Sequence, residues 1–341
     1  MKRLYLGLFM LLLLPAAGQE IYRKWFDQID PAAERALAYL AREQKPDGSF
    51  PDAYGNSCGI PALAGMAWLS KGYLPTDGPY ATELNRVIDY LLKHQNDDGV
   101  FEGGEGGAGP MYSHTIATLF LSEVSGMTDE VRQEKVAKAL KRALSLILRA
   151  QAVKKPDKDQ GGWRYHPNSR DSDTSCSGWA LMALKSARLN GAAVPDAAIR
   201  EALDYLYRHF HPQEGHFGYT MIGANRSSLT GMGLLCLELC GRHGRPETLL
   251  AGDYVLDNLH RLQGNPYESY ANYYNAQAMF QLGGSYWKTY ADWMYQRYLK
   301  LQGEDGSWHA REGGRIYGTA ITTLAFTVPY RQLPIYQRDE E

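Results

Sequence analysis

Two apolar patterns alternate along the chain. In the first, as in PAAERALAYLAREQ from Pro31 and PDAAIREALDYLYRHF from Pro195, apolar residues recur every three or four positions among polar ones. This spacing predicts helices with one buried and one exposed face, and the leading proline suits a first helical turn. The second pattern is apolar and small all round, which predicts helices covered on every side. Six segments have this second pattern: CGIPALAGMAWL, SHTIATLFLSEV, TSCSGWALMALKSA, SSLTGMGLLCLELC, ANYYNAQAMFQL and YGTAITTLAF.

A short phrase recurs at the end of each half-exposed segment. It is clearest as YLAREQKPDGSF from Tyr39, YLLKHQNDDGVF from Tyr90 and YLKLQGEDGSW from Tyr298, and looser as LILRAQ, YLYRHFHPQEGHF and NLHRLQ. Six copies of an outer and an inner helix predict an all-α fold, an α6/α6 toroid in which six inner and six outer helices close a barrel. Neither end repeat has the polar face that caps an open solenoid. A single toroid domain over residues 19–341 is therefore favoured over two domains.

The residues of the phrase have a structural interpretation. Its glutamine can bind free carbonyls at the end of an outer helix, its glycine allows a left-handed turn, and its last aromatic residue can wedge between repeats. The glutamines are Gln44, Gln95, Gln151, Gln263 and Gln302. The glycines are Gly48, Gly99, Gly161, Gly215 and Gly306. The aromatic residues are Phe50, Phe101, Trp163, Phe217 and Trp308.

This phrase resembles the QW repeat of the terpenoid cyclase and protein prenyltransferase superfamily, whose squalene cyclases have an aromatic residue and leucine, then glutamine, then Gly-x-aromatic. The resemblance covers nearly the whole mature chain and implies the superfamily's α/α toroid. It implies less about function, because one fold hosts unrelated activities. Two copies depart from the pattern: Phe210 replaces the glutamine of the fourth, and the fifth has NPYESY where Gly-x-aromatic is expected. We expect those two repeats to be held less tightly.

The first residues predict export. Lys2 and Arg3 precede an apolar run from Leu4 to Leu14, followed by small residues up to Gly18. This is the pattern of a signal peptide over residues 1–18, and the run is shorter than the roughly 20 apolar residues that span a bilayer. The mature protein is therefore expected to be periplasmic or secreted, without a stable membrane anchor.

Charge and cysteine content narrow the partners. With 36 basic and 38 acidic residues and no basic block, the chain is not expected to bind nucleic acid. Four cysteines in an exported chain could pair. However, Cys236 and Cys240 share one helical face while Cys58 and Cys176 sit in separate segments, so buried thiols are an equal alternative.

The inner helices of a toroid all start at the same end, so their first turns should converge on one mouth. Aromatic and polar residues gather at these starts, and helix N-termini favour an anionic group. The alternative interpretation is that the small polar residues only cap helices and the tyrosines only fill the interior. The candidate catalytic residues are Asp171, Asp173 and His114. The candidate ligand-binding residues are Tyr112, Cys176, Trp179, Tyr273, Tyr274 and Tyr317.

The stretch DSDTSCS, residues 171–177, has the most chemical character. Its Asp-Thr end resembles class II terpene cyclases, in which an Asp-x-Asp-Asp-Thr stretch holds the acid that protonates an alkene. One carboxylate of that pattern is missing here, because Ser172 or Thr174 takes its place, depending on the alignment. Much of the like-charge pressure that raises a carboxyl pKa is lost with it. We therefore favour Asp173 as the N-cap of the next helix and Asp171 as the carboxylate more available for function.

The resemblance to prenyltransferases would imply a zinc site of Asp, Cys and His. Cys58, Cys176, His114 and Asp173 could meet at the mouth, but none has close ligand spacing such as Cys-x-x-Cys. No metal and no cofactor are expected on this ground.

Two functions remain open at this point. The first is a binding protein that holds an apolar or mixed small molecule in the barrel, or a protein partner at its rim. The second is an enzyme of unassigned chemistry, terpene-cyclase-like or glycan-acting, that uses Asp171 and neighbouring mouth residues.

Overall fold

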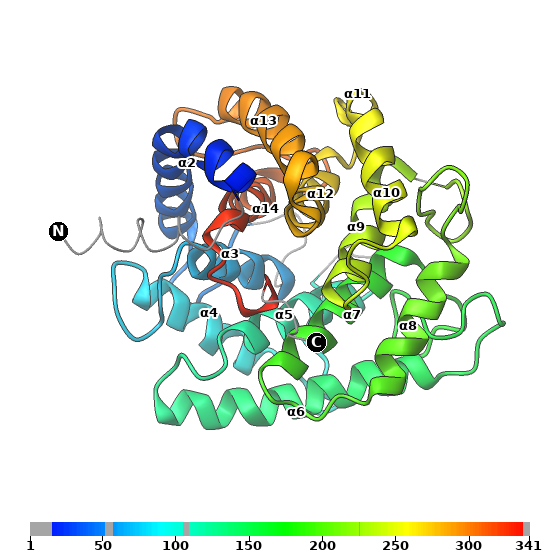
Figure 1. Ribbon diagram of the computed structural model, residues 1–341. Helices are drawn as coiled ribbons and strands as arrows, with labels where there is room; N and C mark the ends of the chain where they lie inside the picture. Colours follow the sequence, from blue (N-terminus) through cyan, green and yellow to red (C-terminus); the bar gives the residue numbers. More distant parts are fainter. Residues whose placement is uncertain (1–15, 52–56, 105–108, 225, 337–341) are drawn as a thin grey trace.

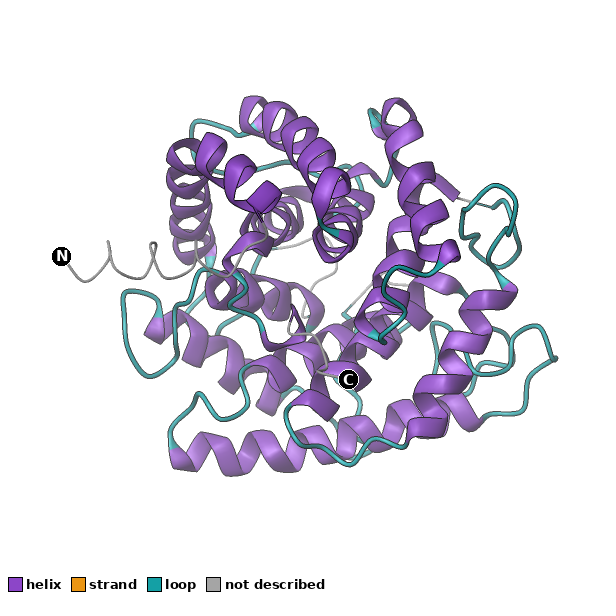
Figure 2. Cartoon of the chain, viewed as in Figure 1, coloured by secondary structure: helices purple, strands orange, loops and turns teal. Residues whose placement is uncertain are grey.

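A computed structural model describes residues 16–51, 57–104, 109–224 and 226–336. These residues form helices joined by turns and contain no β-strand (Figure 2). Six helices form an inner ring: α3 (Gly59–Ser70), α5 (Met111–Glu123), α7 (Thr174–Leu189), α9 (Arg226–Leu239), α12 (Glu268–Leu282) and α14 (Gly314–Thr327). Six surround it: α2 (Ala16–Glu43), α4 (Ala81–Lys93), α6 (Glu130–Ala152), α8 (Asp196–Arg208), α10 (Pro246–Asp257) and α13 (Gly284–Leu301). The remaining elements are short: α11 (Leu259–Leu262), η1 (Val328–Tyr330) and η2 (Pro334–Tyr336).

The inner ring is closed. Each inner helix packs against the next in chain order, and the last, α14, packs against the first, α3. The outer helices lie around them, with α13 beside α2, so that the last repeat meets the first (Figure 1). The predicted all-α toroid is therefore confirmed.

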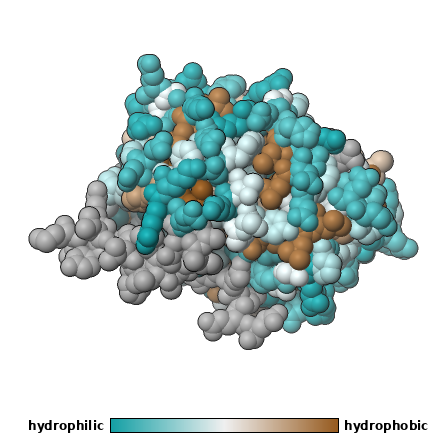
Figure 3. All heavy atoms as spheres, turned by 45° about the horizontal axis from the view of Figure 1, so that its top comes forward, coloured by the Kyte–Doolittle hydropathy of each residue, from teal (hydrophilic) through white to brown (hydrophobic). Residues whose placement is uncertain are grey.

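The inner helices are buried because they lack a polar face. In α7 every residue from Thr174 to Ala187 is buried. Small residues let these helices approach closely: a Cβ at Gly178 would lie 2.2 Å from Sδ of Met232 on α9. The outer helices instead turn their polar residues to solvent, and the surface seen in Figure 3 is mostly hydrophilic, with apolar residues in a few groups.

The glutamines of the repeated phrase join neighbouring repeats through a pair of hydrogen bonds, which we call a glutamine pin. Nε2 of Gln151 donates to Gly161 O in its own turn at 2.9 Å and to Ala198 O in the following outer helix, α8, at 2.8 Å. Gln95 and Gln302 make the same pair of bonds, with Gln302 reaching α2 and so joining the last repeat to the first. The partner carbonyls thus belong to the turn and to the next outer helix, whereas the sequence interpretation placed them at the end of an outer helix.

The two departing repeats differ in this respect. Phe210 packs on Phe217, with ring centroids 4.9 Å apart, and has no amide to donate. Gln263 is exposed to solvent. The exposure of Gln263 corrects the sequence analysis, which counted it among the glutamines that bind helix carbonyls.

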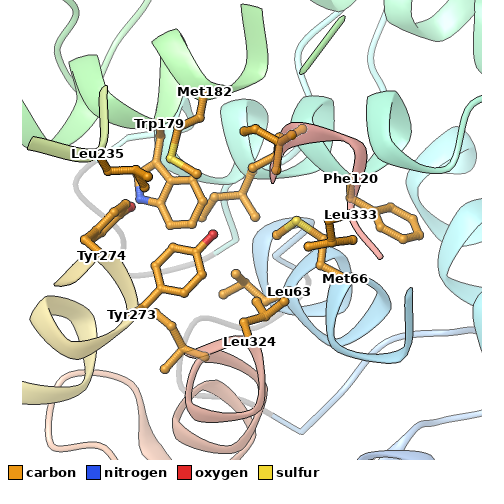
Figure 4. Packing of buried hydrophobic residues seen from close by; sticks show 14 of the residues in the cluster. Leu63, Met66, Phe120, Trp179, Met182, Leu235, Tyr273, Tyr274, Leu324 and Leu333 are labelled. Atoms are coloured by element: carbon orange, nitrogen blue, oxygen red, sulfur yellow. The ribbon is translucent and has the colours of Figure 1, made fainter. Parts of the chain in front are cut away.

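The C-terminal segment covers one end of the barrel, where the inner helices finish. Ile335 N donates to both carboxylate oxygens of Glu123, at the end of α5, at 3.2 Å. Nε2 of Gln281, at the end of α12, donates to Tyr336 O at 3.3 Å. Leu333 inserts beside Met66 and Phe120 (Figure 4). Among the described residues, this segment covers the end of the barrel opposite the one where the inner helices begin.

The predicted signal peptide lies mostly outside the described residues, and its last three positions, 16–18, form the start of α2. None of the described helices is long and apolar enough to cross a membrane. Cys58, Cys176 and Cys236 are buried thiols, and Cys240 is half-buried.

Candidate functional site

A cavity of about 510 Å³ opens where the inner helices begin, and all six inner helices contribute to its wall. Its aromatic residues are Tyr112, Tyr165, Trp179, Tyr219, Tyr267, Tyr270 and Tyr317. Its aliphatic residues are Ile60, Leu63, Ile116 and Leu229, and its hydroxyl-bearing serines are Ser57, Ser113, Ser175 and Ser228. Glu312 is the one carboxyl group among the described lining residues. The predicted convergence of inner-helix first turns on one mouth is thus what the structure has.

Asp173 is the N-cap of α7, as the sequence analysis favoured. Its Oδ1 accepts a hydrogen bond from Cys176 N at 2.8 Å and another from the Ser175 hydroxyl. Its side chain is completely buried. The Ser175 hydroxyl is also hydrogen-bonded to the phenol of Tyr112. Because Ser175 and Tyr112 both line the cavity, a chain of hydroxyl groups connects the Asp173 carboxylate to the cavity.

Arg164 holds the other side of this carboxylate. It donates from one terminal nitrogen to Asp173 Oδ2 at 2.9 Å and to the Tyr219 hydroxyl at 2.8 Å. Its Nε lies 3.2 Å from an oxygen of Asp171, whose side chain is 58% exposed. Asp171 and Asp173 therefore share a cation, which is the opposite of the like-charge crowding of an Asp-x-Asp-Asp-Thr stretch.

Arg164 also orders the cavity wall. Its guanidinium carbon lies 4.3 Å from the ring centre of Tyr165 and 5.4 Å from that of Tyr219, and the two phenols are hydrogen-bonded to each other. A half-buried cation stacked on aromatic rings is stabilised by their π faces. Arg164, which pairs with the carboxylate that caps α7, therefore also holds Tyr165 and Tyr219 in the cavity wall.

His114 does not line the cavity. Its Nδ1 accepts a hydrogen bond from Phe101 N at 3.2 Å, and its Nε2 lies 3.2 Å from Ala143 O on α6. Burial lowers the pKa of His114 to about 4, so the ring is neutral at pH 7. The histidine joins an inner to an outer helix and is not brought together with Asp171 or Asp173.

The predicted ligand-binding residues separate into two groups. Tyr112, Trp179 and Tyr317 line the cavity. Tyr273 and Tyr274 are buried behind it and pack on Trp179, with ring centroids 5.6 and 5.5 Å away (Figure 4). They set the position of the tryptophan.

Cys176 also lies behind the cavity wall, where burial raises the pKa of its thiol well above the usual range. Cys58 points elsewhere, with its sulfur 3.9 Å from His94 O. The four residues considered for a zinc site at the mouth are therefore not gathered in one place.

The sequence analysis missed Arg164, Tyr165, Tyr219, Tyr270 and Glu312. Oε1 of Glu312 accepts a hydrogen bond from Tyr270 N at 2.8 Å, and burial raises the pKa of its carboxyl group. A positional signal was available for most of them. Arg164, Tyr165 and Tyr219 come one or two residues after Gly-x-aromatic, and Glu312 lies in the corresponding loop before α14, so the chain leads from each turn directly to the mouth.

Comparison with known proteins agrees with a terpenoid-cyclase-like toroid. Over 193 residues, 56% of this chain, the sequence is 29% identical to a drimenyl diphosphate synthase from Streptomyces showdoensis. The matched part is 33% of that protein, so the chain spans about a third of the length of the curated relative it matches. No protein family model matches the chain. The resemblance to the terpenoid cyclase superfamily is thereby confirmed.

Solved structures share the fold. A variant of the type II terpene cyclase MstE from Scytonema, in complex with geranylgeranyl dihydroxybenzoate, superposes with a TM-score of 0.58 at 13% identity, covering 90% of this chain and 99% of that one. An inactive variant of the α-1,6-mannanase GH76A from Salegentibacter sp. HEL1_6, bound to α-1,6-mannotriose, superposes with a TM-score of 0.66 at 8% identity, covering 89% and 99%. At these identities the likeness concerns the toroid alone.

Proposed function

We propose that the chain is a terpenoid-cyclase-type enzyme that holds an isoprenoid chain in the aromatic cavity and starts its reaction by protonating a carbon–carbon double bond. The observation that carries this proposal is the connection of the buried Asp173 carboxyl group, through Ser175 and Tyr112, to an otherwise aromatic and aliphatic cavity. The sequence match to a drimenyl diphosphate synthase supports the same class of chemistry.

The cavity suits an apolar substrate that becomes a cation. Its volume of about 510 Å³ lies within the range of roughly 300–1,000 Å³ that small-molecule sites occupy. Aliphatic residues at its wall bind hydrocarbon, and the faces of seven aromatic rings attract positive charge within about 6 Å. A carbocation formed inside is stabilised by these faces and shielded from water.

The chain's own groups can move the proton. In its acid form, Asp173 gives its proton to the Ser175 hydroxyl, which passes its own to Tyr112, which protonates the double bond. An O–H bond breaks, the π pair forms a new C–H bond, and the positive charge appears on the adjacent carbon. Arg164 and Cys176 N stabilise the carboxylate left behind. Ring closure is followed by loss of a proton from carbon to the Tyr112 oxygen, and transfer through Ser175 returns a proton to the carboxylate and restores the starting state.

A ligand-binding protein without turnover is the second candidate. It is favoured by one observation, namely that Arg164, Ser175 and Cys176 N already supply donors to both oxygens of Asp173, as they would for a permanent carboxylate. A glycan-acting enzyme is less favoured, because glycosidases use two carboxyl groups about 5–9.5 Å apart and the described lining residues supply Glu312 alone.

The deciding experiment compares Asp173→Asn with Asp171→Asn. Asparagine also caps helices, so the first variant keeps the fold but loses the acid, and the second removes the exposed carboxylate beside it. The purified chain is incubated with C15 and C20 isoprenoids, with and without a diphosphate, and products are separated by gas chromatography and mass spectrometry. We expect cyclic products from the wild type and from Asp171→Asn, and at least about a hundredfold less from Asp173→Asn.

Full activity of Asp173→Asn would reduce Asp173 to a helix cap, and Glu312→Gln would then test the other carboxyl group. Isoprenoid binding measured by calorimetry, without product from any variant, would leave the protein as a binder.

Export forms part of the proposal. The predicted signal peptide over residues 1–18 supports it, and fractionation of expressing cells followed by N-terminal sequencing would test it: an N-terminus at residue 19 in the periplasm or medium is expected. An isoprenoid or a protein partner at the rim would then be met outside the cytoplasm.

A further inference from the structure

The turn of the fourth repeat lacks the glutamine pin of the second, third and sixth repeats. Gln95, Gln151 and Gln302 each bind a turn carbonyl and a carbonyl of the next outer helix. Phe210 occupies the corresponding place after α8 and cannot make either bond. Whatever joins this turn to the following helix, α10, must differ from the common arrangement.

The same turn carries two imidazoles and a carboxylate. One ligand atom from each of His211, Glu214 and His216 lies within 4.8 Å of the other two, and they are the one such group among the described residues. Nε2 of His216 is 3.3 Å from Oε2 of Glu214, and the two imidazole centroids are 4.9 Å apart. None of the three lines the cavity.

The backbone of this turn already fixes the cluster. His211 N donates to His216 O and Gly215 N donates to His211 O, both at 2.8 Å. His216 is 1% exposed and packs on the ring of Tyr254 in α10, with centroids 5.4 Å apart. His216 therefore touches the next outer helix through ring packing, where other repeats use a glutamine amide, while Glu214 is exposed and His211 half-buried.

We propose that His211, Glu214 and His216 bind Zn²⁺ as a clip that takes the place of the missing glutamine pin. Zinc bonds to imidazole nitrogen and carboxylate oxygen are about 2.0–2.2 Å long, so ligand atoms of a tetrahedral site lie about 3.3 Å apart. The separation between His216 and Glu214 has this value. Two nitrogen ligands disfavour Mg²⁺ and Ca²⁺, which take oxygen. The solvent side leaves the fourth position to water.

Binding requires one local exchange. Glu214 N donates to His211 Nδ1 at 3.1 Å, so zinc either replaces this hydrogen bond at Nδ1 or binds Nε2 after a change of tautomer. Either route breaks the hydrogen bond from Glu214 N to His211 Nδ1, while the two backbone hydrogen bonds of the turn stay possible.

The test uses the full chain, stripped with a chelator and titrated with Zn²⁺, with calorimetry and thermal unfolding as readouts. Co²⁺ reports the geometry, because tetrahedral Co²⁺ has intense visible absorption. We expect one zinc per chain, a rise in Tm, and binding at least about tenfold weaker in His211→Gln and in Glu214→Gln. His260→Gln, at an exposed histidine of α11, is the matched control and should bind as the wild type does.

Glu214 is exposed and His211 is half-buried, so substitutions there disturb the fold less than one at the buried His216 would. Absence of zinc binding by the wild type, or wild-type zinc affinity in both ligand variants, would overturn the site. Phe210→Gln supplies a glutamine at the pin position and should reduce the zinc-dependent rise in Tm. An unchanged rise would overturn the clip role. No readout depends on activity, so the outcome is independent of the proposed function.

Discussion

The carboxyl group of Asp173 both caps a helix and is linked by hydrogen bonds to the cavity. Its Oδ1 caps α7 and reaches the cavity through hydroxyl groups, while its Oδ2 pairs with Arg164. A cap alone would be replaceable by asparagine at little cost. The ion pair makes the charge matter for stability as well, because removing one partner of a buried pair strands the other.

The stability of Asp173 variants measures this difference. If Asp173 were only a helix cap, Asp173→Ala would lower the free energy of unfolding by about 1 kcal/mol and Asp173→Asn would hardly change it. Because Arg164 is also paired to the carboxylate, we expect the free energy of unfolding to fall by about 2–4 kcal/mol in Asp173→Ala and by about 1–2 kcal/mol in Asp173→Asn. Urea unfolding of both variants checks this. Equal losses would mean that the cap bond contributes nothing, and no loss for asparagine would mean that Asp171 alone satisfies Arg164.

At the scale of helices, repeat-to-repeat contacts depend on the glutamine pins. Each pin closes its own turn and reaches the next outer helix, so it links elements that are sequential in the chain and adjacent in the ring. Gln151 is the clearest case, since it is 3% exposed and makes both bonds within 2.9 Å.

We expect Gln151→Ala to lower the free energy of unfolding by about 1–3 kcal/mol, because two buried hydrogen bonds of roughly 0.5–1.5 kcal/mol each are lost. Gln263→Ala is the matched control. Its side chain is exposed, and its loss should change stability by less than about 0.5 kcal/mol. Comparable losses in the two variants would contradict the role given to the pins.

The helix pairs and their number followed from the sequence because the two apolar patterns differ in kind, one with a polar face and one without. Because the inner helices are apolar on every side, their sequence does not indicate which side of each helix faces the cavity. Tyr112 and His114 are two positions apart on α5, yet one lines the cavity and the other contacts α6. Arg164 was missed for another reason: its role depends on Asp173 and Tyr219, which only the fold brings near.

On the scale of the whole molecule, the C-terminal segment closes the barrel end opposite the cavity. Glu123 fastens it through Ile335 N and is also hydrogen-bonded by Ser186. Burial raises the pKa of Glu123 from 4.5 to about 7. The folded protein therefore holds a proton there that the unfolded chain has already released at intermediate pH.

This pKa shift predicts a pH dependence of stability. Below pH 4.5 both states are protonated and the favourable contribution of the neutral carboxyl group is complete; it is lost as the pH rises from 4.5 to about 7. Relative to Glu123→Gln, whose side chain does not titrate, the wild type should lose up to about 3 kcal/mol across that window, since one pKa unit corresponds to about 1.4 kcal/mol. Denaturant titrations at several pH values measure the difference, and parallel profiles for the two proteins would contradict it.

The closed ring of inner helices places the first and last repeats side by side. The cavity can therefore form only after the last repeat has been synthesised. Tyr317 of α14 lines the cavity next to residues of α3 that leave the ribosome some 250 residues earlier. Helix pairs can form one after another as the chain grows, but the wall of the cavity stays open until the sixth pair arrives. A nascent chain therefore has the aromatic residues of the site long before it has an interior to keep water out.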